Sequence, residues 1–508
     1  MPAIERDLAY NRILAFENAM CRRFDKPRMQ RYREARDYYS GENLPADNVA
    51  QPLRINYIQS IANKHTAYLF GEYDDDVLGW RCDPLQVNDS SKVLAEKITA
   101  WCYQKCRQND ANQLFPIMGI DGSVCGDSFV RARWDEIEQR VCWESIAPEY
   151  VHCRWNATNM ARIEELVISY PMHRDDALAE FGTSGNTSWN RSAFASPMLG
   201  MAIYWEEWNP MIYRVYIDDV QVRDDVNPTA RKATSPLDFR PGLIPLVHFP
   251  NFEAAHEFYG YSDVDSAFAL QDELNRKLAD EGDTINAYAH PITVINRYFG
   301  DLEELPVGPD QVWNLGREGE AKLLTWGGPA PEVHKYIEII REIMLETASV
   351  SPVAYGRHKG TQQSAIALAI EMLPLTERVR RKRAIWASRL RQLLQMTAFI
   401  EDRNQGLDGF TYKDFIAHFI RPLWAPPLPR DRLALVNENI ALHSGGLRTI
   451  ERVNEDIGEE RPSEKAQQIK EELKELSDMG IKVGGGSGFG SSSLPEGADK
   501  ETMKGTAK

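Results

Sequence analysis

Residues 351–360, SPVAYGRHKG, combine helix-breaking residues with a cluster of positive charge. One proline and two glycines disfavour a continuous helix in this stretch. Its charged side chains are Arg357 and Lys359, and His358 lies between them. Proteins that grip nucleic-acid phosphates do so with clustered Lys and Arg. The whole chain has 59 Lys and Arg against 75 Asp and Glu, so any contact with nucleic acid should be weak or local.

Other reactive side chains form no catalytic pattern. Cys102 and Cys106 are four residues apart on one face of an expected helix, but no His or Cys pair follows to complete a metal site. Buried free thiols in a reducing compartment are the better interpretation. The acidic run 74–76 is typical of a solvated turn, and Gly119–Ser128 lacks the lysine and the spacing of a phosphate-binding loop. We therefore predict no catalytic residue, no metal, no cofactor and no enzymatic activity.

The composition is that of a soluble globular protein of several domains. A chain of 508 residues predicts two to four structural units, and 43% apolar with 26% charged residues is ordinary. No apolar run approaches the roughly 18 residues of a membrane span. The first residues lack a signal-peptide core, so we do not expect secretion.

The first half of the chain predicts helices followed by an antiparallel sheet. Apolar spacing indicates helices over 4–39, 55–70, 91–107 and 109–120. The alternating segments that follow are SFVRARWD, QRVCWESI, RIEELVISY, GMAIYWEEW and MIYRVYID. Residues 1–260 are therefore expected to form one α+β domain.

Two further helices are expected on either side of a short strand-containing segment. The first covers 263–288, where bases pair with some acids at a spacing of four. The acids without such a base are Asp280, Glu281 and Asp283. The second covers 332–349 and carries Glu338, Glu342 and Glu346 at a spacing of four. Because like charges at this spacing repel one another, an ordinary solvent-exposed face is the simplest interpretation. The strand-like pieces between the helices are ITVINRYF, QVWNLG and AKLLTW.

A very long helix is expected over 362–403, interrupted by Pro374. Its second half is basic and includes Arg380, Arg381, Lys382 and Arg383. A solvated face or one that forms salt bridges between subunits is favoured over nucleic-acid contact. The predicted elements after it are a strand near 411–420, helices near 431–442, 446–456 and 462–479, and a flexible tail over 481–508.

Three stretches, in this order, resemble the portal proteins of tailed bacteriophages, in the branch with long non-contractile tails. The stretches are YYSGEN followed by RINYIQSIANKHTAYLFGE, then GLIPLVHFPNFEAAHEFYGYSDVDSAFALQDELNRKLAD, then QSAIALAIEMLPL. The likeness in order spans roughly residues 10–450. It implies an α+β portal-type fold with a wing, a helical stem, a small α/β clip, a tunnel loop followed by a long kinked helix, and a helical crown.

The resemblance assigns each part of that fold to a range of this chain. The ranges are 1–260 for the wing, 261–288 and 332–350 for the stem helices, 289–331 for the clip, 351–361 for the tunnel loop, 362–403 for the long kinked helix, 404–480 for the wing return and crown, and 481–508 for the tail.

The resemblance also implies a function and a set of partners. The protein would form a dodecameric ring at one capsid vertex, through which double-stranded DNA is packaged and ejected without regard to sequence. Expected partners are the terminase large subunit, the major capsid and scaffolding proteins, and head-completion or adaptor proteins, with no membrane. The protein would be assembled in the host cytoplasm and belong to the virion.

Within such a ring the charged groups acquire expected roles. Arg357, His358 and Lys359 would touch DNA phosphates, unless this loop packs on a neighbour's acidic stem face. The acids named above on the helices 263–288 and 332–349 would line the channel and repel DNA. The basic residues of the long helix would meet an adjacent subunit. A metal-dependent DNA-processing enzyme and a head–tail adaptor ring remain the alternative readings of the chain.

Overall fold

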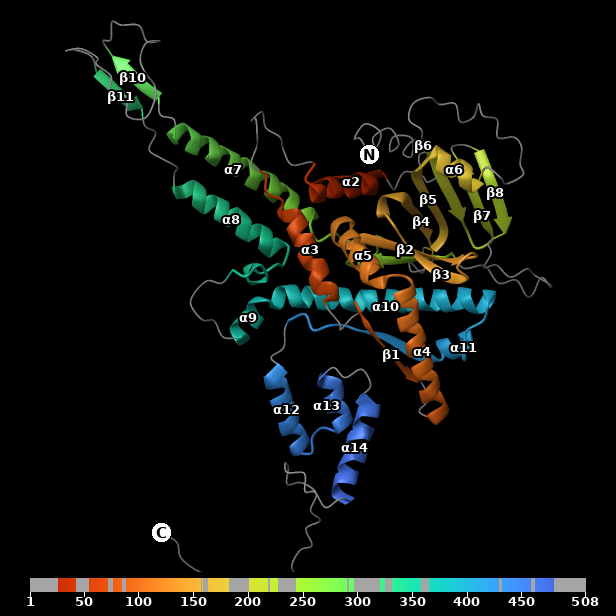
Figure 1. Ribbon diagram of the computed structural model, residues 1–508. Helices are drawn as coiled ribbons and strands as arrows, with labels where there is room; N and C mark the ends of the chain where they lie inside the picture. The colour runs from red at the N-terminus through yellow and green to blue at the C-terminus, as the bar shows by residue number, and fades with distance from the viewer. Residues whose placement is uncertain are drawn as a thin grey trace, which may run out of the picture. The chain divides into compact units, whose positions relative to one another are not determined.

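The computed structural model is an α+β protein in two compact units, residues 1–427 and 428–508 (Figure 1). The residues described are 26–42, 54–71, 76–84, 88–156, 158, 163–181, 201–217, 220–226, 244–289, 292–296, 320–324, 331–357, 365–428, 432–457 and 462–478.

Four helices open the described part of the first unit, and short polar caps set several of their ends. They are α2 (Lys26–Ser40), α3 (Tyr57–Phe70), α4 (Asp89–Gln108) and α5 (Ala111–Cys125). The side chain of Asn56 accepts a hydrogen bond from the Gln59 amide at the start of α3, and Asn88 caps α4 in the same way. Helix α2 agrees with the described part of the helix predicted over 4–39. Helices α3, α4 and α5 agree with those predicted over 55–70, 91–107 and 109–120, with ends shifted by a few residues.

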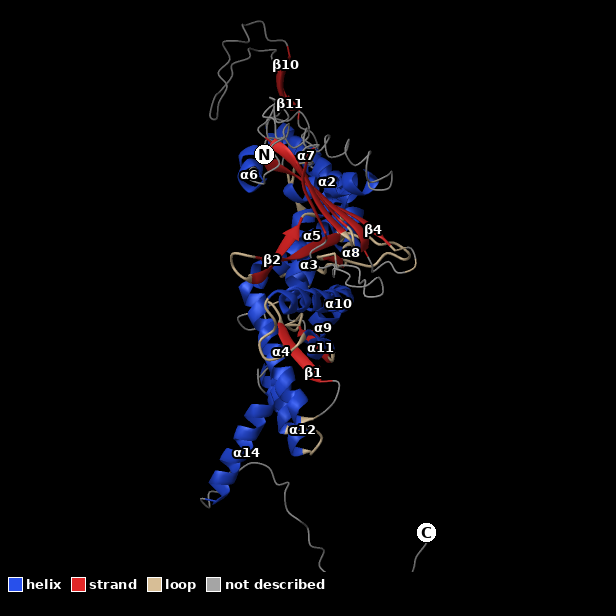
Figure 2. Cartoon of the chain, turned by 90° about the vertical axis from the view of Figure 1, so that its right-hand side faces the viewer, coloured by secondary structure: helices blue, strands red, loops and turns tan. Residues whose placement is uncertain are grey.

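The strands form antiparallel sheets, as their alternating patterns predict. A three-stranded sheet has the order β3-β2-β9, and a five-stranded sheet has the order β4-β5-β6-β7-β8, whose strands run side by side as one twisted layer in Figure 2. The strands are β2 (Asp127–Asp135), β3 (Arg140–Ile146), β4 (Val151–Trp155), β5 (Ile163–His173), β6 (Met201–Trp208), β7 (Ile212–Ile217), β8 (Val220–Val226) and β9 (Leu246–Pro250). A 3-10 turn, η1 (Pro148–Tyr150), precedes β4, and helix α6 (Arg174–Phe181) follows β5.

Residues near 411–420 do not form the continuous strand that we predicted. They form a short helix, α11 (Tyr412–Ile416), and then strand β12 (His418–Leu423). The reason is local, because Thr411 and Asp414 make a reciprocal capping box that starts the helix. Strand β12 pairs with β1 (Gly79–Pro84) in antiparallel register, so the sheet and helices of the first 260 residues are completed by a segment from much later in the chain.

The main hydrophobic core lies where helix α10 (Leu373–Asn404) crosses the first unit. This helix contacts α3, β2, β9 and β12, and Figure 1 shows it lying across the lower ends of α3 and α5. Trp386 is fully buried against Phe70 and Phe249, with ring centroids 5.4 and 5.2 Å away. Aromatic packing of this kind stabilises a core beyond the area that it buries.

A second junction lies where α5 turns into β2. Gly126 ends α5 with a φ of 92°, and a Cβ there would lie 2.7 Å from the carbonyl oxygen of Gly260. A glycine is needed at this position because the conformation and the close approach both exclude a side chain. The next residue, Asp127, is buried and accepts hydrogen bonds from the Gly260 amide and from Nε2 of His248, each at 2.7 Å.

The second unit contains three helices: α12 (Arg432–Ser444), α13 (Ile450–Ile457) and α14 (Pro462–Asp478). Each contacts the next along the chain. The middle helix begins later than the predicted residue 446, because Gly446 adopts a φ of 71° and the chain turns there. Within the described part of the chain, every helix is too short or too polar to cross a membrane.

Candidate functional site

Helices α7 (Phe268–Ala289) and α8 (Pro331–Thr347) pack against each other and project side by side from the rest of the first unit (Figure 1). A 3-10 turn, η2 (Asp265–Ala267), leads into α7. The described residues between the helices include β10 (Ile292–Asn296) and β11 (Glu320–Leu324), which pair antiparallel. These strands match two of the predicted pieces, and the third, QVWNLG, lies outside the described residues.

Two of the three acids expected to be unpaired on the first of these helices have basic partners. Asp280 accepts from Nζ of Lys277 at 2.9 Å, and Glu281 is 9% exposed and contacts Nδ1 of His334 on α8. The prediction failed because it considered only bases four residues away, whereas bases three residues away and bases on a packed helix also lie within reach. Asp283 is exposed.

Helix α8 has apolar side chains on two adjacent faces. Ile340 and Met344 are 3% and 0% exposed, which places them in the interior of the first unit. Tyr336, Ile339 and Ile343 are 41–44% exposed. Of the predicted acids of this helix, Glu338 and Glu346 are exposed and Glu342 is half-buried. We call Tyr336, Ile339 and Ile343 the outer stripe of α8.

The predicted basic loop begins with an ordered turn rather than a free tip. Residues Pro352–Tyr355 form a 3-10 turn, η4, capped by the side chain of Ser351. The Tyr355 hydroxyl accepts from Ser60 of α3 at 3.3 Å, and Nζ of Lys64 lies 5.4 Å from the tyrosine ring centroid. The side chain of Arg357 is exposed. His358 and Lys359 lie outside the described residues.

The expected long helix consists of α9 (Ala365–Glu371) and α10, with an interruption at Met372. Pro374 is the second residue of α10. A proline has no amide hydrogen to donate, and the first turn of a helix is where that loss matters least. The break therefore falls where the proline predicts it.

Half of the basic face that we expected to meet an adjacent subunit points into the same chain. Lys382 is 1% exposed and pairs with Asp263. Arg383 donates to the carbonyl oxygens of Leu69, Tyr68 and Ala425 at 2.7–2.9 Å. These two assignments were wrong because charged side chains are expected at the surface. Their spacing along the helix gives no sign that a partner elsewhere in the chain draws them inward.

The other two residues of that face remain at the surface. Arg380 is exposed and lies 3.4 Å from Glu377, one turn earlier in α10. Arg381 is also exposed, with its guanidinium 5.8 Å from the ring centroid of Phe252. An intersubunit role for these two arginines stays a prediction.

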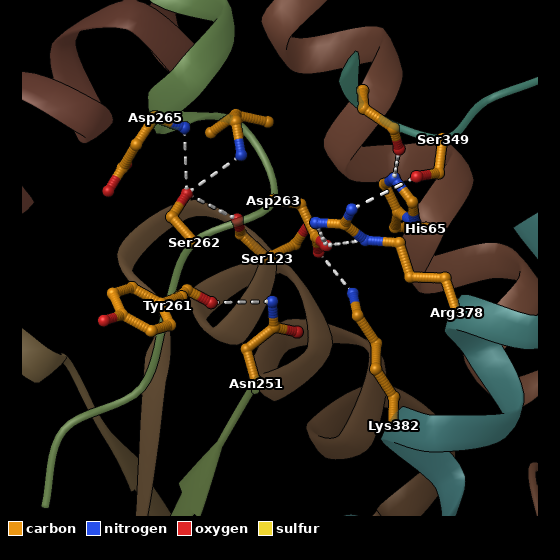
Figure 3. Close-up of polar contacts among 12 residues, drawn as sticks. His65, Ser123, Asn251, Tyr261, Ser262, Asp263, Asp265, Ser349, Arg378 and Lys382 are labelled. Atoms are coloured by element: carbon orange, nitrogen blue, oxygen red, sulfur yellow. Dashed lines mark hydrogen bonds and ion pairs between the residues drawn. The ribbon is translucent and has the colours of Figure 1, made fainter. Parts of the chain in front are cut away.

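A buried ion cluster connects the segment before α7 and the segment after α8 to helix α10 (Figure 3). Its centre is Asp263, whose side chain is fully buried just before η2. Arg378 and Lys382 of α10 are its ion-pair partners, the former at 3.0 Å, and the hydroxyl of Ser123 donates to it at 2.7 Å. Arg378 also donates to Ser349 Oγ at 3.3 Å, beyond the end of α8.

The charges of this cluster are compatible with one another. Burial alone would raise the pKa of Asp263. The cationic Lys382 and Arg378, joined by His65 when that histidine is protonated in acid, lower it well below its usual range. Burial lowers the pKa of His65 to about 4, so this histidine is neutral at pH 7. The carbonyl oxygen of Ala348 can only accept a hydrogen bond, so Nε2 of His65 carries the proton and donates it at 2.9 Å. An aspartate in a mixed loop carries no periodic signal. Helical spacing placed His65 on the apolar face of its helix, but nothing in the sequence predicted that Asp263, His65 and Ser349 come together.

In the part of the chain that the structure describes, the cysteines and acids form no metal-binding group. Cys102 and Cys106 are buried free thiols, as predicted, and burial raises the pKa of both. Among the described residues, no group of three His, Cys, Asp or Glu side chains could hold a metal ion. Asp76 instead pairs with Arg107 at 2.8 Å.

Comparison with known proteins adds one finding to this geometry. The family model described as "Phage portal protein, SPP1 Gp6-like" matches residues 21–479. That range contains every element described above. A comparison with curated proteins finds no match.

Proposed function

This chain belongs to the phage portal protein family, and we propose that it forms a dodecameric ring at the unique capsid vertex, through which DNA is packaged and ejected. The family is structural, so the chain is not an enzyme, and membership implies a capsid-associated oligomer in the virion. The observation that carries the proposal is the match over residues 21–479 of a 508-residue chain.

The order of elements supports an assignment of each part of the portal fold. A helix, a strand pair, a second helix, an ordered turn and a broken long helix follow one another from α7 to α10. We assign α7 and α8 to the stem, 289–331 to the clip, 351–361 to the tunnel loop and 362–403 to the long kinked helix. The wing then comprises 1–260 with the return through β12, and the crown comprises the helices of the second unit.

The outer stripe of α8 supports assembly into an oligomer. Tyr336, Ile339 and Ile343 are each more than two-fifths exposed and lie three and four residues apart, which aligns them along one face of the helix. Contiguous exposed apolar groups of this kind mark surfaces that a partner covers. In a ring, that partner would be the stem of an adjacent subunit.

The charged groups of the stem and tunnel loop suit a conduit that must not retain DNA. Glu338 and Glu346 are exposed on α8, and Asp283 is exposed on α7. Carboxylates facing the channel would repel the phosphate backbone, while Arg357, His358 and Lys359 would touch it briefly. Phosphate contacts carry no sequence information, which suits passage of a whole genome.

The proposal also names partners for the ends of the ring. The terminase large subunit would dock on the clip during packaging. Head-completion or adaptor proteins would take its place afterwards, and the major capsid and scaffolding proteins would surround the wing. These partners follow from the proposed position at the capsid vertex.

Electron microscopy of the purified protein, with a native mass measurement, tests the ring. We expect rings with a central hole and a mass of about twelve chains of 57.9 kDa each. Small species that persist across salt and protein concentrations would contradict the conduit, and we would then assay metal-dependent DNA cleavage.

The tunnel-loop assignment has its own test. We expect Arg357→Ala combined with Lys359→Ala to weaken DNA retention in filled heads, because two phosphate contacts per subunit are lost. The difference from the unaltered protein should shrink as salt rises, since salt weakens such contacts. The matched control is Lys97→Ala combined with Lys413→Ala, which removes two exposed charges from α4 and α11. Unchanged retention at every salt concentration would favour packing of the loop on a neighbour's acidic stem face.

A further inference from the structure

Helix α8 ends in a conformation that its own sequence does not favour. Ser349 follows the helix with a φ of 58°. The Val350 amide donates to the Leu345 carbonyl oxygen at 2.8 Å, and the Ser349 amide donates to the Glu346 carbonyl oxygen at 2.9 Å. This is the closing pattern in which glycine is the usual left-handed residue. A serine there strains the backbone, and such strain persists only where the surroundings hold it.

The side chain of Ser349 explains why a serine is tolerated. Its hydroxyl accepts a hydrogen bond from Nη1 of Arg378 at 3.3 Å, while Nε of the same arginine donates to Asp263 at 3.0 Å (Figure 3). Arg378 and Lys382 are four residues apart on α10, so both reach the same carboxylate. The strained residue at the end of α8 is thereby tied to α10.

A second contact holds the same turn from the other side. His65 of α3 is fully buried, and its Nε2 donates to the carbonyl oxygen of Ala348 at 2.9 Å. That carbonyl lies just past the last helical residue of α8, where an acceptor otherwise lacks a partner. The end of α8 is therefore fixed to α3 and to α10 within two consecutive residues.

We infer that Ser349, Arg378 and Asp263 form a latch that sets the direction in which the chain leaves α8. We call these three side chains the latch. They are positioning residues: they touch no DNA in this inference, but they orient residues 350–357 relative to α10. A shift of α10 along its axis would move Arg378 and release Ser349, so the loop that follows α8 would respond to the position of the long helix.

The latch lies within a single chain, whereas its consequence for DNA rests on the proposed function. The test is hydrogen–deuterium exchange of the amides of residues 350–357 in the full chain, with the thermal midpoint measured beside it. We expect Ser349→Ala to raise exchange of these amides about tenfold, since a hydrogen bond to a charged group is lost. Arg378→Gln should act in the same way, and the combined variant should add little to either one.

Two further variants separate the latch from general damage to the fold. Ser349→Gly also removes the hydroxyl but suits the left-handed conformation, so we expect faster local exchange with an unchanged or higher thermal midpoint. Arg133→Gln removes an exposed guanidinium of β2, which belongs neither to the latch nor to the basic face of α10, and should leave exchange unaltered. If Ser349→Ala and Ser349→Gly both keep the protection of the unaltered chain, the latch is refuted.

DNA retention in filled heads distinguishes the latch from the proposed function. Faster exchange with reduced retention would support both. Faster exchange with normal retention would keep the latch and contradict the assignment of residues 351–361 to a DNA-facing loop.

Discussion

His65 makes the joint between α3 and α8 sensitive to acid. Burial lowers its pKa to about 4 in the folded chain, whereas an unfolded histidine titrates near 6.5. Below pH 6.5 the unfolded chain therefore binds a proton that the folded chain does not. The contribution of neutral, buried His65 to the free energy of unfolding is therefore complete above pH 6.5. It is lost as the pH falls from about 6.5 to about 4.

We predict that the free energy of unfolding falls by about 2 kcal/mol from this histidine between pH 7 and pH 5. Urea unfolding at the two pH values measures it. Asp121 acts in the opposite direction over part of this range, since burial raises its pKa to about 6, so the comparison is with His65→Gln. That variant keeps a donor for Ala348 and should lose less stability on acidification.

The exposed His443 offers the control for this measurement. His443→Gln should follow the unaltered chain at both pH values. Equal losses in the unaltered chain and in His65→Gln would mean that His65 does not titrate as its buried position implies.

At the scale of one helix, α8 presents two neighbouring isoleucines to different surroundings. Ile339 is 41% exposed in the outer stripe, and Ile340 is 3% exposed in the interior of the first unit. Substituting either isoleucine by serine makes the same chemical change on one of two adjacent faces of the helix. The two substitutions therefore separate the stability of one chain from assembly of several chains.

We predict that Ile340→Ser destabilises the unassembled chain by about 3 kcal/mol or more, because it leaves a cavity and buries a hydroxyl. Ile339→Ser should change the unassembled chain by less than about 0.5 kcal/mol but should reduce the fraction of protein in rings. Thermal unfolding and native mass measurements give the two quantities. Normal ring formation by Ile339→Ser would remove the outer stripe from the subunit contact.

At the scale of the whole chain, the first unit depends on a segment that arrives after α10. Phe415 and Ile420 are 1% and 2% exposed and belong to the main core, and β12 pairs with β1. Arg383 of α10 also donates to the Ala425 carbonyl at 2.7 Å. Because this core is built from such distant segments, we expect it to unfold as a unit when the late segment is lost.

Two truncations test this dependence. A chain that ends at Pro427 should keep the cooperative thermal transition of the first unit. A chain that ends at Gln405 lacks α11 and β12 and should lose that transition, because β1 has no partner and the core is open on one side. Similar transitions in both truncated chains would show that the return through β12 is dispensable.

The sequence by itself predicted the elements whose signals are local. Apolar spacing with Gly71 at its end indicates α3, the alternation of apolar residues marks the strands, and Pro374 predicts the break before α10. The order of these elements also carried the family resemblance that the family model bears out. Caps, breakers and periodicity act within a few residues, so no tertiary information was needed.

Only the tertiary structure decided which charged side chains face inward. Lys382 and Arg383 have the same spacing and charge as exposed helix residues, and their burial depends on Asp263 and on carbonyl groups far away in the sequence. Glu281 meets His334 only because α7 packs on α8. Such partners are brought together by packing between distant segments, and helical spacing within one segment carries no information about them.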